Sequence, residues 1–85
     1  MHNKNKFMCP VCGYEYLEEK PYDKQGNASF EICPSCGTEF GYDDANKSNK
    51  DLRAKWIKNG KNWWSKSPTP KNWDPDQQLE NLKKD

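Results

Sequence analysis

The 85-residue sequence is short of apolar residues and has only one histidine. Hydrophobic residues make up 32% of the chain, and no run approaches the ~18 consecutive apolar residues of a membrane span, so we expect no membrane contact. No apolar leader follows Met1, which favours a cytoplasmic location. The single histidine, His2, offers no Ser-His or Cys-His nucleophilic pair, and we expect it to be solvated. The sequence therefore predicts a cytoplasmic protein that is not an enzyme.

Because aliphatic residues are scarce, the core must depend on a few large aromatic side chains. The aromatic residues are four Trp, four Tyr and three Phe. A domain of this length buries only about 60–65% of the surface that its unfolded chain exposes. A structural metal ion contributes on the order of 10 kcal/mol of apparent free energy, which would supply the stability that such a thin core lacks.

The four cysteines lie in two short segments of the same pattern, Cys-Pro-x-Cys-Gly, at residues 9–13 and 33–37. A tetrahedral thiolate site needs four sulfurs that converge on one point, and two such segments can each hold the ion from one side. The glycine after each second cysteine can adopt a positive φ, which turns backbone N–H groups toward the sulfurs. We predict one metal site, with one Zn²⁺ per chain, formed by Cys9, Cys12, Cys33 and Cys36.

Two disulfides or four unrelated buried thiols are the alternatives to a metal site. A disulfide within a C-x-x-C segment is usually a redox device, and a cytoplasmic protein keeps its thiols reduced. Reduced thiols are available to a metal ion, so the metal site is the favoured interpretation. Thiol–disulfide exchange stays conceivable, although a bound metal would mask the thiolates.

The sequence of the first half predicts short extended segments around the cysteines. We expect residues 1–6 to be frayed. Near-alternating apolar and polar residues predict strands at 7–8, 14–17 and 29–32, with Phe30 and Ile32 on one face of the last. Residues 23–27 contain Gly26 and Asn27 and predict the turn of a β-hairpin arm.

The second half predicts a helix over residues 49–59. Ser48 is a good N-cap, and Gly60 is suited to a left-handed stop. We expect an apolar stripe on the helix formed by Leu52, Trp56 and Ile57, and a solvent-facing set formed by Arg53, Lys55 and Lys58.

A second, short helix is predicted to begin after Asp74. Pro75 suits the first helical position, Gln77 can complete a capping box, and Leu79 and Leu82 would share one face. The expected fold is a small metal-stabilised α+β domain over residues 1–85. Residues 7–44 would form a four-cysteine zinc ribbon with a short β-hairpin arm, and residues 45–85 a Trp-rich helical tail packed on it.

Two stretches carry a resemblance to known proteins: Cys9–Tyr14 and Phe30–Asp44, with its Glu-Ile-Cys-Pro-x-Cys segment and aromatic-acidic tract. These resemble the bacterial cysteine-rich CPCC, zinc-ribbon-like small proteins. Residues 52–79 look like the tail of a longer subgroup, although Val11 and Ser35 stand where an extra cysteine would complete the C-P-C-C pattern. The resemblance implies metal binding and no activity.

The cysteine segments are also similar to those of rubredoxin, whose four cysteines hold a redox-active iron. Here the stretch between the two segments is shorter than in ordinary rubredoxins, and about half of the chain follows the second segment. Iron and zinc can both occupy a tetrahedral thiolate site. A rubredoxin-like iron electron carrier is therefore the alternative to a zinc protein.

Charge is unevenly distributed along the chain. Residues 1–44 carry four Lys against eight acidic residues, a balance of −4, whereas residues 45–85 carry ten basic residues against five acidic ones, a balance of +5. Basic residues interleaved with tryptophan suit a nucleic-acid surface. That surface would use Lys55, Lys58, Lys61, Trp63, Trp64 and Lys66.

The alternative interpretation is that the tryptophans are needed inside, and it favours a module that interacts with an unidentified protein partner. Asp43 and Asp44 could be imagined as an acid/base pair, but adjacent carboxylates after an aromatic run are more typical of a solvated corner or a turn that leads into a helix. Four cysteines would also close the coordination shell that a catalytic zinc keeps open.

Overall fold

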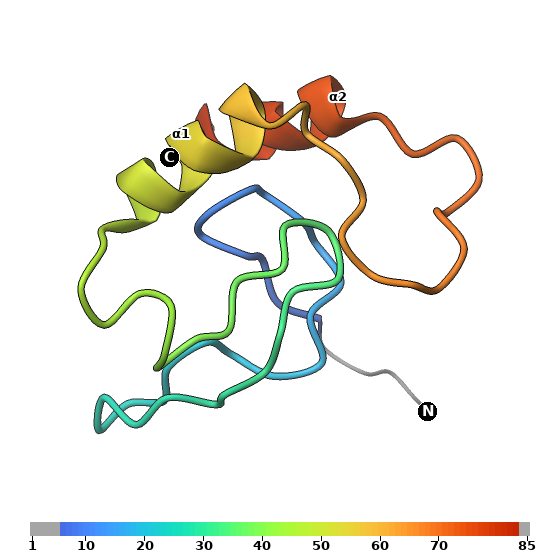
Figure 1. The fold of residues 1–85 in the computed structure, drawn as a ribbon. Coiled ribbons are helices and arrows are strands. Elements are labelled where there is room, and N and C mark those ends of the chain that lie inside the picture. The colour runs from blue at the N-terminus through green and yellow to red at the C-terminus, as the bar shows by residue number, and fades with distance from the viewer. Residues whose placement is uncertain (1–5, 84–85) are drawn as a thin grey trace, which may run out of the picture.

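The computed structural model describes residues 6–83, and His2 and most of the predicted frayed segment lie outside them. Two helices, α1 (Asn49–Lys58) and α2 (Pro75–Leu79), are followed by a 3-10 helix, η1 (Glu80–Lys83). Both α-helices lie on one side of the molecule, above the looping backbone of the first half (Figure 1). Within residues 6–83, no helix is both long enough and apolar enough to cross a membrane.

Helix α1 begins and ends where its capping residues predict. The Ser48 side chain accepts a hydrogen bond from the backbone N–H of Asp51 at 3.0 Å, and Gly60 follows the C-cap with a φ of 106°. Trp56 is the buried residue of the helix, whereas Ile57 is 41% exposed, so the predicted apolar stripe is narrower than expected. Because Trp56 is large, it can provide most of the packing by itself.

Helix α2 is also confirmed at its predicted start. The Asp74 carboxylate accepts hydrogen bonds from the N–H groups of Asp76 and Gln77, and Pro75 occupies the first turn. Leu79 packs against the core, and the chain then tightens into η1.

No strand forms within residues 6–83, so the predicted α+β class is not confirmed. The extended segments make only isolated antiparallel bridges: Phe7 with Leu17, Tyr22 with Ala28, and Ile32 with Glu39. The Tyr22–Ala28 bridge closes the predicted turn, in which Gly26 has a φ of 87°. The hairpin arm is therefore a loop closed by one bridge.

The predicted return strand at 29–32 fails for a local reason. Phe30 has a φ of 59°, a left-handed conformation that interrupts an extended chain. Phe30 is 60% exposed and Ile32 is 41% exposed, so neither side chain is buried in the core. The Glu31 carboxylate instead accepts hydrogen bonds from the N–H groups of Glu18 and Glu19, which ties the two extended segments together.

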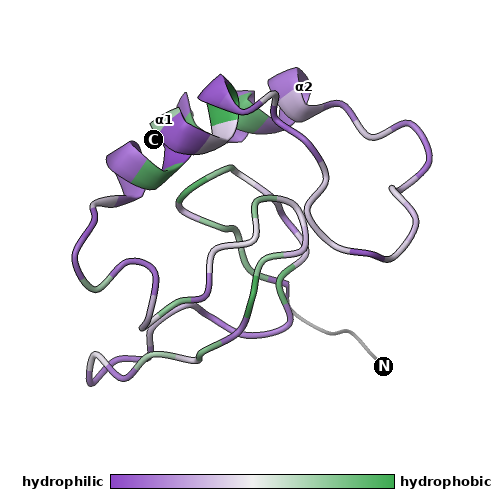
Figure 2. Ribbon diagram, in the orientation of Figure 1, coloured by the Kyte–Doolittle hydropathy of each residue, from purple (hydrophilic) through white to green (hydrophobic). Residues whose placement is uncertain are grey.

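The core is built around the cysteines. Among residues 6–83, seven hydrophobic residues are buried, and three of them are cysteines: Cys9, Val11, Cys12, Leu17, Cys33, Phe40 and Trp56. Apolar stretches follow the inner loops of the first half, whereas the two α-helices carry much hydrophilic surface (Figure 2). An ion bound between the sulfurs would therefore lie at the centre of the molecule.

Candidate metal centre

The first cysteine segment, residues 9–13, folds as a tight turn that we call the first knuckle. The N–H of Gly13 donates to the carbonyl of Cys9 at 2.9 Å, and the N–H of Cys9 donates to the carbonyl of Tyr14 at 2.7 Å. Gly13 has a φ of 88° and is buried, so a side chain there would be strained and would meet the carbonyl of Gln78. The predicted positive φ at this glycine is confirmed.

The second knuckle, residues 33–37, repeats the same pattern of hydrogen bonds. The N–H of Gly37 donates to the carbonyl of Cys33 at 2.8 Å, and the N–H of Cys33 donates to the carbonyl of Thr38 at 3.0 Å. Gly37 has a φ of 81° and lies against the ring of Trp64. Two segments that are 24 residues apart in register thus present their cysteines in the same way.

The four cysteine Sγ atoms converge, and all lie within 4.8 Å of one another. Two pairs that join the knuckles are 3.8 Å (Cys9 and Cys36) and 3.7 Å (Cys12 and Cys33) apart. An ion with metal–sulfur bonds of about 2.3 Å at the centre of a tetrahedron needs sulfurs about 3.8 Å apart. These distances are far longer than the ~2.05 Å of a disulfide, and the four cysteines are free. The residues therefore fit a tetrahedral metal ion.

The pKa values of the thiols diverge because the sulfurs contact one another. The Cys12 side chain raises the pKa of Cys9 and of Cys33, and burial adds to both effects. Hydrogen bonds with Cys12 and Cys33 lower the pKa of Cys36 below its usual range. A cation among them would favour the thiolate form of every ligand.

The carbonyls of the first knuckle are bound by side chains from the second half of the chain. Arg53 of α1 donates from Nε to the carbonyl of Val11 at 2.7 Å and from a terminal nitrogen to that of Pro10 at 2.9 Å. The prediction that Arg53 faces solvent is therefore wrong. The two N–H donors of its guanidinium group match two consecutive carbonyls, and they bring a positive charge to the first knuckle.

The next two carbonyls of the first knuckle are bound by residues of α2 and η1. Gln78, which is buried, donates from Nε2 to the carbonyl of Cys12 at 3.2 Å, and Asn81 donates to that of Gly13 at 3.0 Å. Four consecutive carbonyls are thus satisfied by only three side chains. Because these carbonyls are occupied, the knuckle is fixed in the conformation that directs its sulfurs inward.

The second knuckle is bound mainly by backbone. The N–H groups of Trp64 and Ser65 donate to the carbonyls of Ser35 and Pro34 at 3.1 and 2.9 Å. Gln78 also donates to Ser35 Oγ at 2.9 Å, so one amide group contacts both knuckles. At Cys36, Thr38 Oγ1 lies 3.2 Å from the sulfur.

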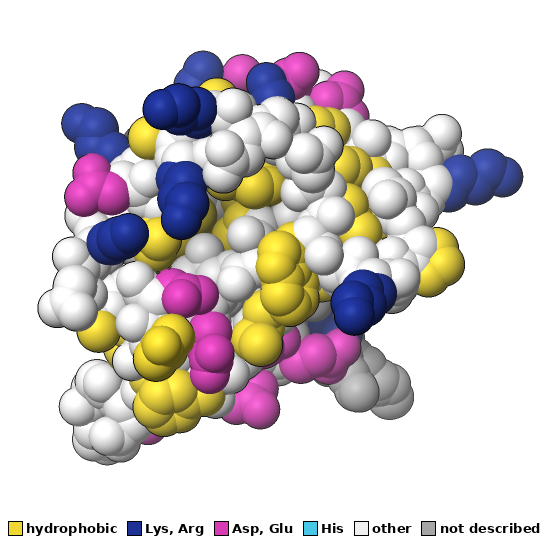
Figure 3. All heavy atoms as spheres, viewed as in Figure 1, with side chains coloured by type: hydrophobic (Ala, Val, Ile, Leu, Met, Phe, Trp, Pro, Cys, Tyr) yellow, Lys and Arg dark blue, Asp and Glu magenta, His cyan; other side chains and the backbone are white. Residues whose placement is uncertain are grey.

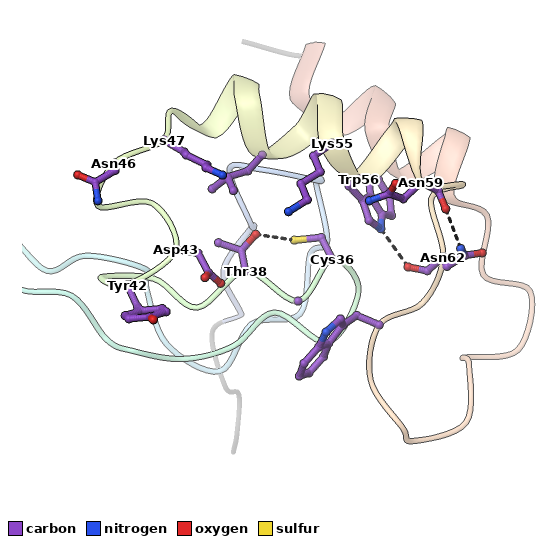
Figure 4. Close-up of a pocket in the computed structure, with 13 residues that line it drawn as sticks. Cys36, Thr38, Tyr42, Asp43, Asn46, Lys47, Lys55, Trp56, Asn59 and Asn62 are labelled. Carbon is purple, nitrogen blue, oxygen red and sulfur yellow. Dashed lines mark hydrogen bonds between the residues drawn. The ribbon is translucent and has the colours of Figure 1, made fainter.

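A groove of about 610 Å³ opens between α1 and the second knuckle (Figure 4). Lys55 and Trp56 of α1 lie on one side of it, and Cys36 and Thr38 on the other. Asn59 and Asn62 are joined by a hydrogen bond at its end. Cys36 is the one cluster cysteine that lines this groove.

The predicted nucleic-acid residues are not equivalent in the structure. The ring of Trp63 packs edge-on against Tyr14 and Trp73, whereas Trp64 is 57% exposed. Lys61 forms an ion pair with Asp76 at 2.7 Å. Lys55, Lys58 and Lys66 are exposed. The two adjacent tryptophans therefore do not form one exposed stacking surface.

Asp43 and Asp44 cap a turn. Asp43 accepts a hydrogen bond from the N–H of Glu39 at 2.8 Å, and Asp44 accepts from the N–H of Gly41 at 2.8 Å and from the hydroxyl of Tyr22 at 2.6 Å. The bond with Asp44 raises the pKa of Tyr22. These contacts agree with the interpretation of the pair as a turn.

The residues that bind the knuckle carbonyls were not found by sequence reasoning. Gln78 and Asn81 are three residues apart, as are Leu79 and Leu82, so each pair lies on one face of a helix. The polar pair next to the apolar pair was the one sequence feature that could have indicated these two donors. Arg53 carried no such signal, because a basic residue in a basic helix ordinarily faces water.

Comparisons with known proteins give two bacterial relatives. No protein-family model matches the chain, and neither does any solved structure. The chain is similar to the uncharacterized protein YoaQ of Bacillus subtilis (strain 168), with 44% identity over 52 residues, which are 60% of this chain and 41% of YoaQ. It is also similar to the uncharacterized protein YozI of the same strain, with 38% identity over 40 residues, which are 45% of this chain and 33% of YozI.

Each match thus spans less than half of the relative's own length. The relatives show that the chain resembles bacterial proteins. Neither relative's name assigns it an activity, and no family match confirms the resemblance to CPCC proteins or zinc ribbons.

Proposed function

We propose that the chain is a small zinc-binding protein in which Cys9, Cys12, Cys33 and Cys36 hold one structural Zn²⁺. The observation that carries this proposal is the separation of the sulfurs, 3.7 and 3.8 Å across the two knuckles, which is the edge of a tetrahedron around a zinc–sulfur centre. When bound, the ion would join the two knuckles and neutralise part of the thiolate charge. The chain's own residues orient the sulfurs through the bound carbonyls.

The ion's role is structural. Four cysteine ligands leave no coordination position for a substrate or water, and a catalytic zinc needs one. Three of the four ligands also belong to the hydrophobic core, so a change at the ion affects the packing of the whole molecule. We infer that the protein acts by binding another macromolecule.

The partner that we propose is a protein. Three aromatic side chains, Tyr22, Phe30 and Tyr42, are 41%, 60% and 71% exposed, and we call them the aromatic patch. They lie around one turn, because the Phe30 ring contacts Gly41 and the Tyr22 hydroxyl bonds Asp44. Exposed aromatic residues are enriched at protein interfaces. On the visible face, hydrophobic side chains lie beside acidic ones away from α1, while most Lys and Arg side chains lie toward α1 (Figure 3).

The decisive experiment is native mass spectrometry of the purified chain combined with metal analysis. We expect a colourless protein that carries one zinc ion, and its mass also gives the number of chains per particle. A red protein with one iron would support the rubredoxin-like electron carrier instead. A chain that binds no metal with its thiols reduced would end the proposal.

The interaction role has a separate test. A photo-crosslinking residue placed at Tyr42 should give one discrete adduct in cells, whereas the same residue at Lys58, which is exposed on α1, should not. Salt-dependent retention of the wild-type protein on single-stranded nucleic acid, lost in Trp64→Ala, would favour the nucleic-acid alternative.

A further inference from the structure

The four cysteines differ in their access to solvent. Cys9, Cys12 and Cys33 are completely buried, with 0% exposure, whereas Cys36 is partly exposed. Cys36 is also the cluster cysteine that lines the groove between α1 and the second knuckle. Its sulfur lies beneath α1, directed toward Thr38 (Figure 4). A molecule from solvent therefore meets this sulfur before any other.

The groove is large enough for a small molecule. Its volume of about 610 Å³ falls within the ~300–1,000 Å³ of small-ligand sites. Trp56 and Leu52 form an apolar part of the lining, and Trp64, which is largely exposed, lines the groove beside Gly37. A small thiol or chelator can enter such a space, whereas a folded protein cannot.

The charge of the groove favours an anion. Lys47 and Lys55 line it, and neither forms an ion pair within residues 6–83. The carboxylate in the lining, Asp43, is engaged by the N–H of Glu39. Figure 4 shows the Lys55 side chain extending from α1 toward Cys36. A zinc ion held by four thiolates would itself carry a formal charge of −2, so Lys47 and Lys55 are the groups that would draw a carboxylate of an incoming molecule close to the Cys36 sulfur.

We infer that Cys36 is the exchangeable ligand of the cluster, and that its exchange partner is a small thiol that carries carboxylates. The inference rests on the proposed metal site. With zinc bound, the incoming thiol would form a bond to the ion as the bond to Cys36 breaks, and the proton of that thiol would pass to the Cys36 sulfur. Cys9, Cys12 and Cys33 would continue to hold the ion. The hydroxyl of Thr38, 3.2 Å from the sulfur, hydrogen-bonds the released group.

The site of reaction can be mapped on the zinc-loaded protein. Limiting iodoacetate, an anionic alkylating agent, forms a carbon–sulfur bond at a cysteine as iodide leaves, and peptide mass spectrometry locates the product. We expect the first modification at Cys36. Equal modification of the four cysteines, or first modification at Cys9, Cys12 or Cys33, would overturn the inference.

The role of the groove can be tested without changing a ligand. Lys55→Glu should slow the reaction with iodoacetate about fivefold at low salt and leave the reaction with neutral iodoacetamide nearly unchanged. Lys58→Glu is the matched control, because Lys58 is exposed on the same helix and does not line the groove. It should change the rate by less than about twofold. Equal effects of the two variants would contradict access through the groove.

Exchange itself is measured by zinc transfer to a coloured chelator, with reduced glutathione as the thiol. Glutathione should accelerate transfer from the wild-type protein, and the acceleration should fall about fivefold in Lys55→Glu. No acceleration, or the same acceleration in both, would refute the exchange. Native mass spectrometry before the reaction separates two failures: absence of zinc contradicts the proposed function, whereas a zinc-loaded protein that reacts first at another cysteine contradicts only this inference.

Discussion

At the scale of single residues, Gln78 joins three parts of the molecule. Its amide nitrogen donates to the carbonyl of Cys12 and to the hydroxyl of Ser35, and its amide oxygen accepts from the indole N–H of Trp73 at 2.8 Å. Gln78 is buried, so any partner that it releases stays away from water. A buried polar group without a partner costs more than a single hydrogen bond contributes.

Replacement of Gln78 by methionine should therefore destabilise the metal-loaded protein by about 2–3 kcal/mol. Gln77→Met is the matched control, because Gln77 is exposed on the same helix, and it should cost less than about 0.5 kcal/mol. Urea unfolding followed by tryptophan fluorescence measures both. Equal losses in the two variants would show that the bonds of Gln78 to the knuckles do not matter.

The glycine of the second knuckle provides another pair of variants. Gly37 and Gly26 both have a positive φ, at 81° and 87°, but a Cβ at Gly37 would collide with the Trp64 ring, whereas a Cβ at Gly26 would meet nothing within 4 Å. Gly26→Ala should cost about 1–2 kcal/mol from backbone strain alone. Gly37→Ala should cost about 2 kcal/mol more, because the ring must move. Thermal unfolding of both variants gives the difference, and a similar loss in both would contradict the steric account.

At the scale of elements, α1 links the first knuckle to the groove. Arg53 binds the knuckle carbonyls from this helix, and Lys55 lines the groove from the same helix. The Ser48 cap is what fixes the start of the helix. Loss of the cap affects both sides of the cysteine cluster through one element.

Ser48→Ala should lower the free energy of unfolding by about 1 kcal/mol and reduce helical circular dichroism, because the N–H of Asp51 loses its partner. Ser48→Asp, which restores an acceptor at the cap, should recover most of the loss. A variant with alanine that is as stable as the wild type would mean that α1 is held by Trp56 and Arg53 alone.

The helices could be predicted from the sequence because their signals are local. Ser48 and Asp74 cap within three residues of themselves, and Gly60 ends α1 beside it. The absence of strands could not be predicted in this way, because an extended segment becomes a strand only when a second segment pairs with it along its length. Here Phe30 breaks one segment after a single bridge. The four cysteines were predictable from spacing, but the side chains that bind the carbonyls of the first knuckle lie 42 to 68 residues away and left no local pattern.

At the scale of the whole molecule, the proposed metal centre and the hydrophobic core share residues. Removal of the ion by a strong chelator should unfold the chain, because Cys9, Cys12 and Cys33 are three of its seven buried hydrophobic residues. We expect loss of the near-ultraviolet circular dichroism, and its return when one equivalent of zinc is added. A chelated sample that keeps its spectrum and melting temperature would show that the fold does not need the metal.

Acid should have the same effect as the chelator. Protons compete with a bound ion for the cysteine sulfurs, so the stabilisation that the ion provides is present at neutral pH and lost as the pH falls. Tyrosine and tryptophan signals should change together with zinc release in a titration from neutral to acid pH. Zinc release at a pH where the fold remains intact would separate the two processes.

The anchoring of the first knuckle has a consequence for how the protein is made. Its carbonyls are bound by Arg53, Gln78 and Asn81, so the turn that appears first during synthesis is the last to be completed. A nascent chain of the first forty-odd residues contains all four cysteines but none of these donors. A nascent chain that stops short of α1 therefore has its four thiols without the donors that fix the first knuckle, and we expect those thiols to be more open to oxidation than in the complete fold.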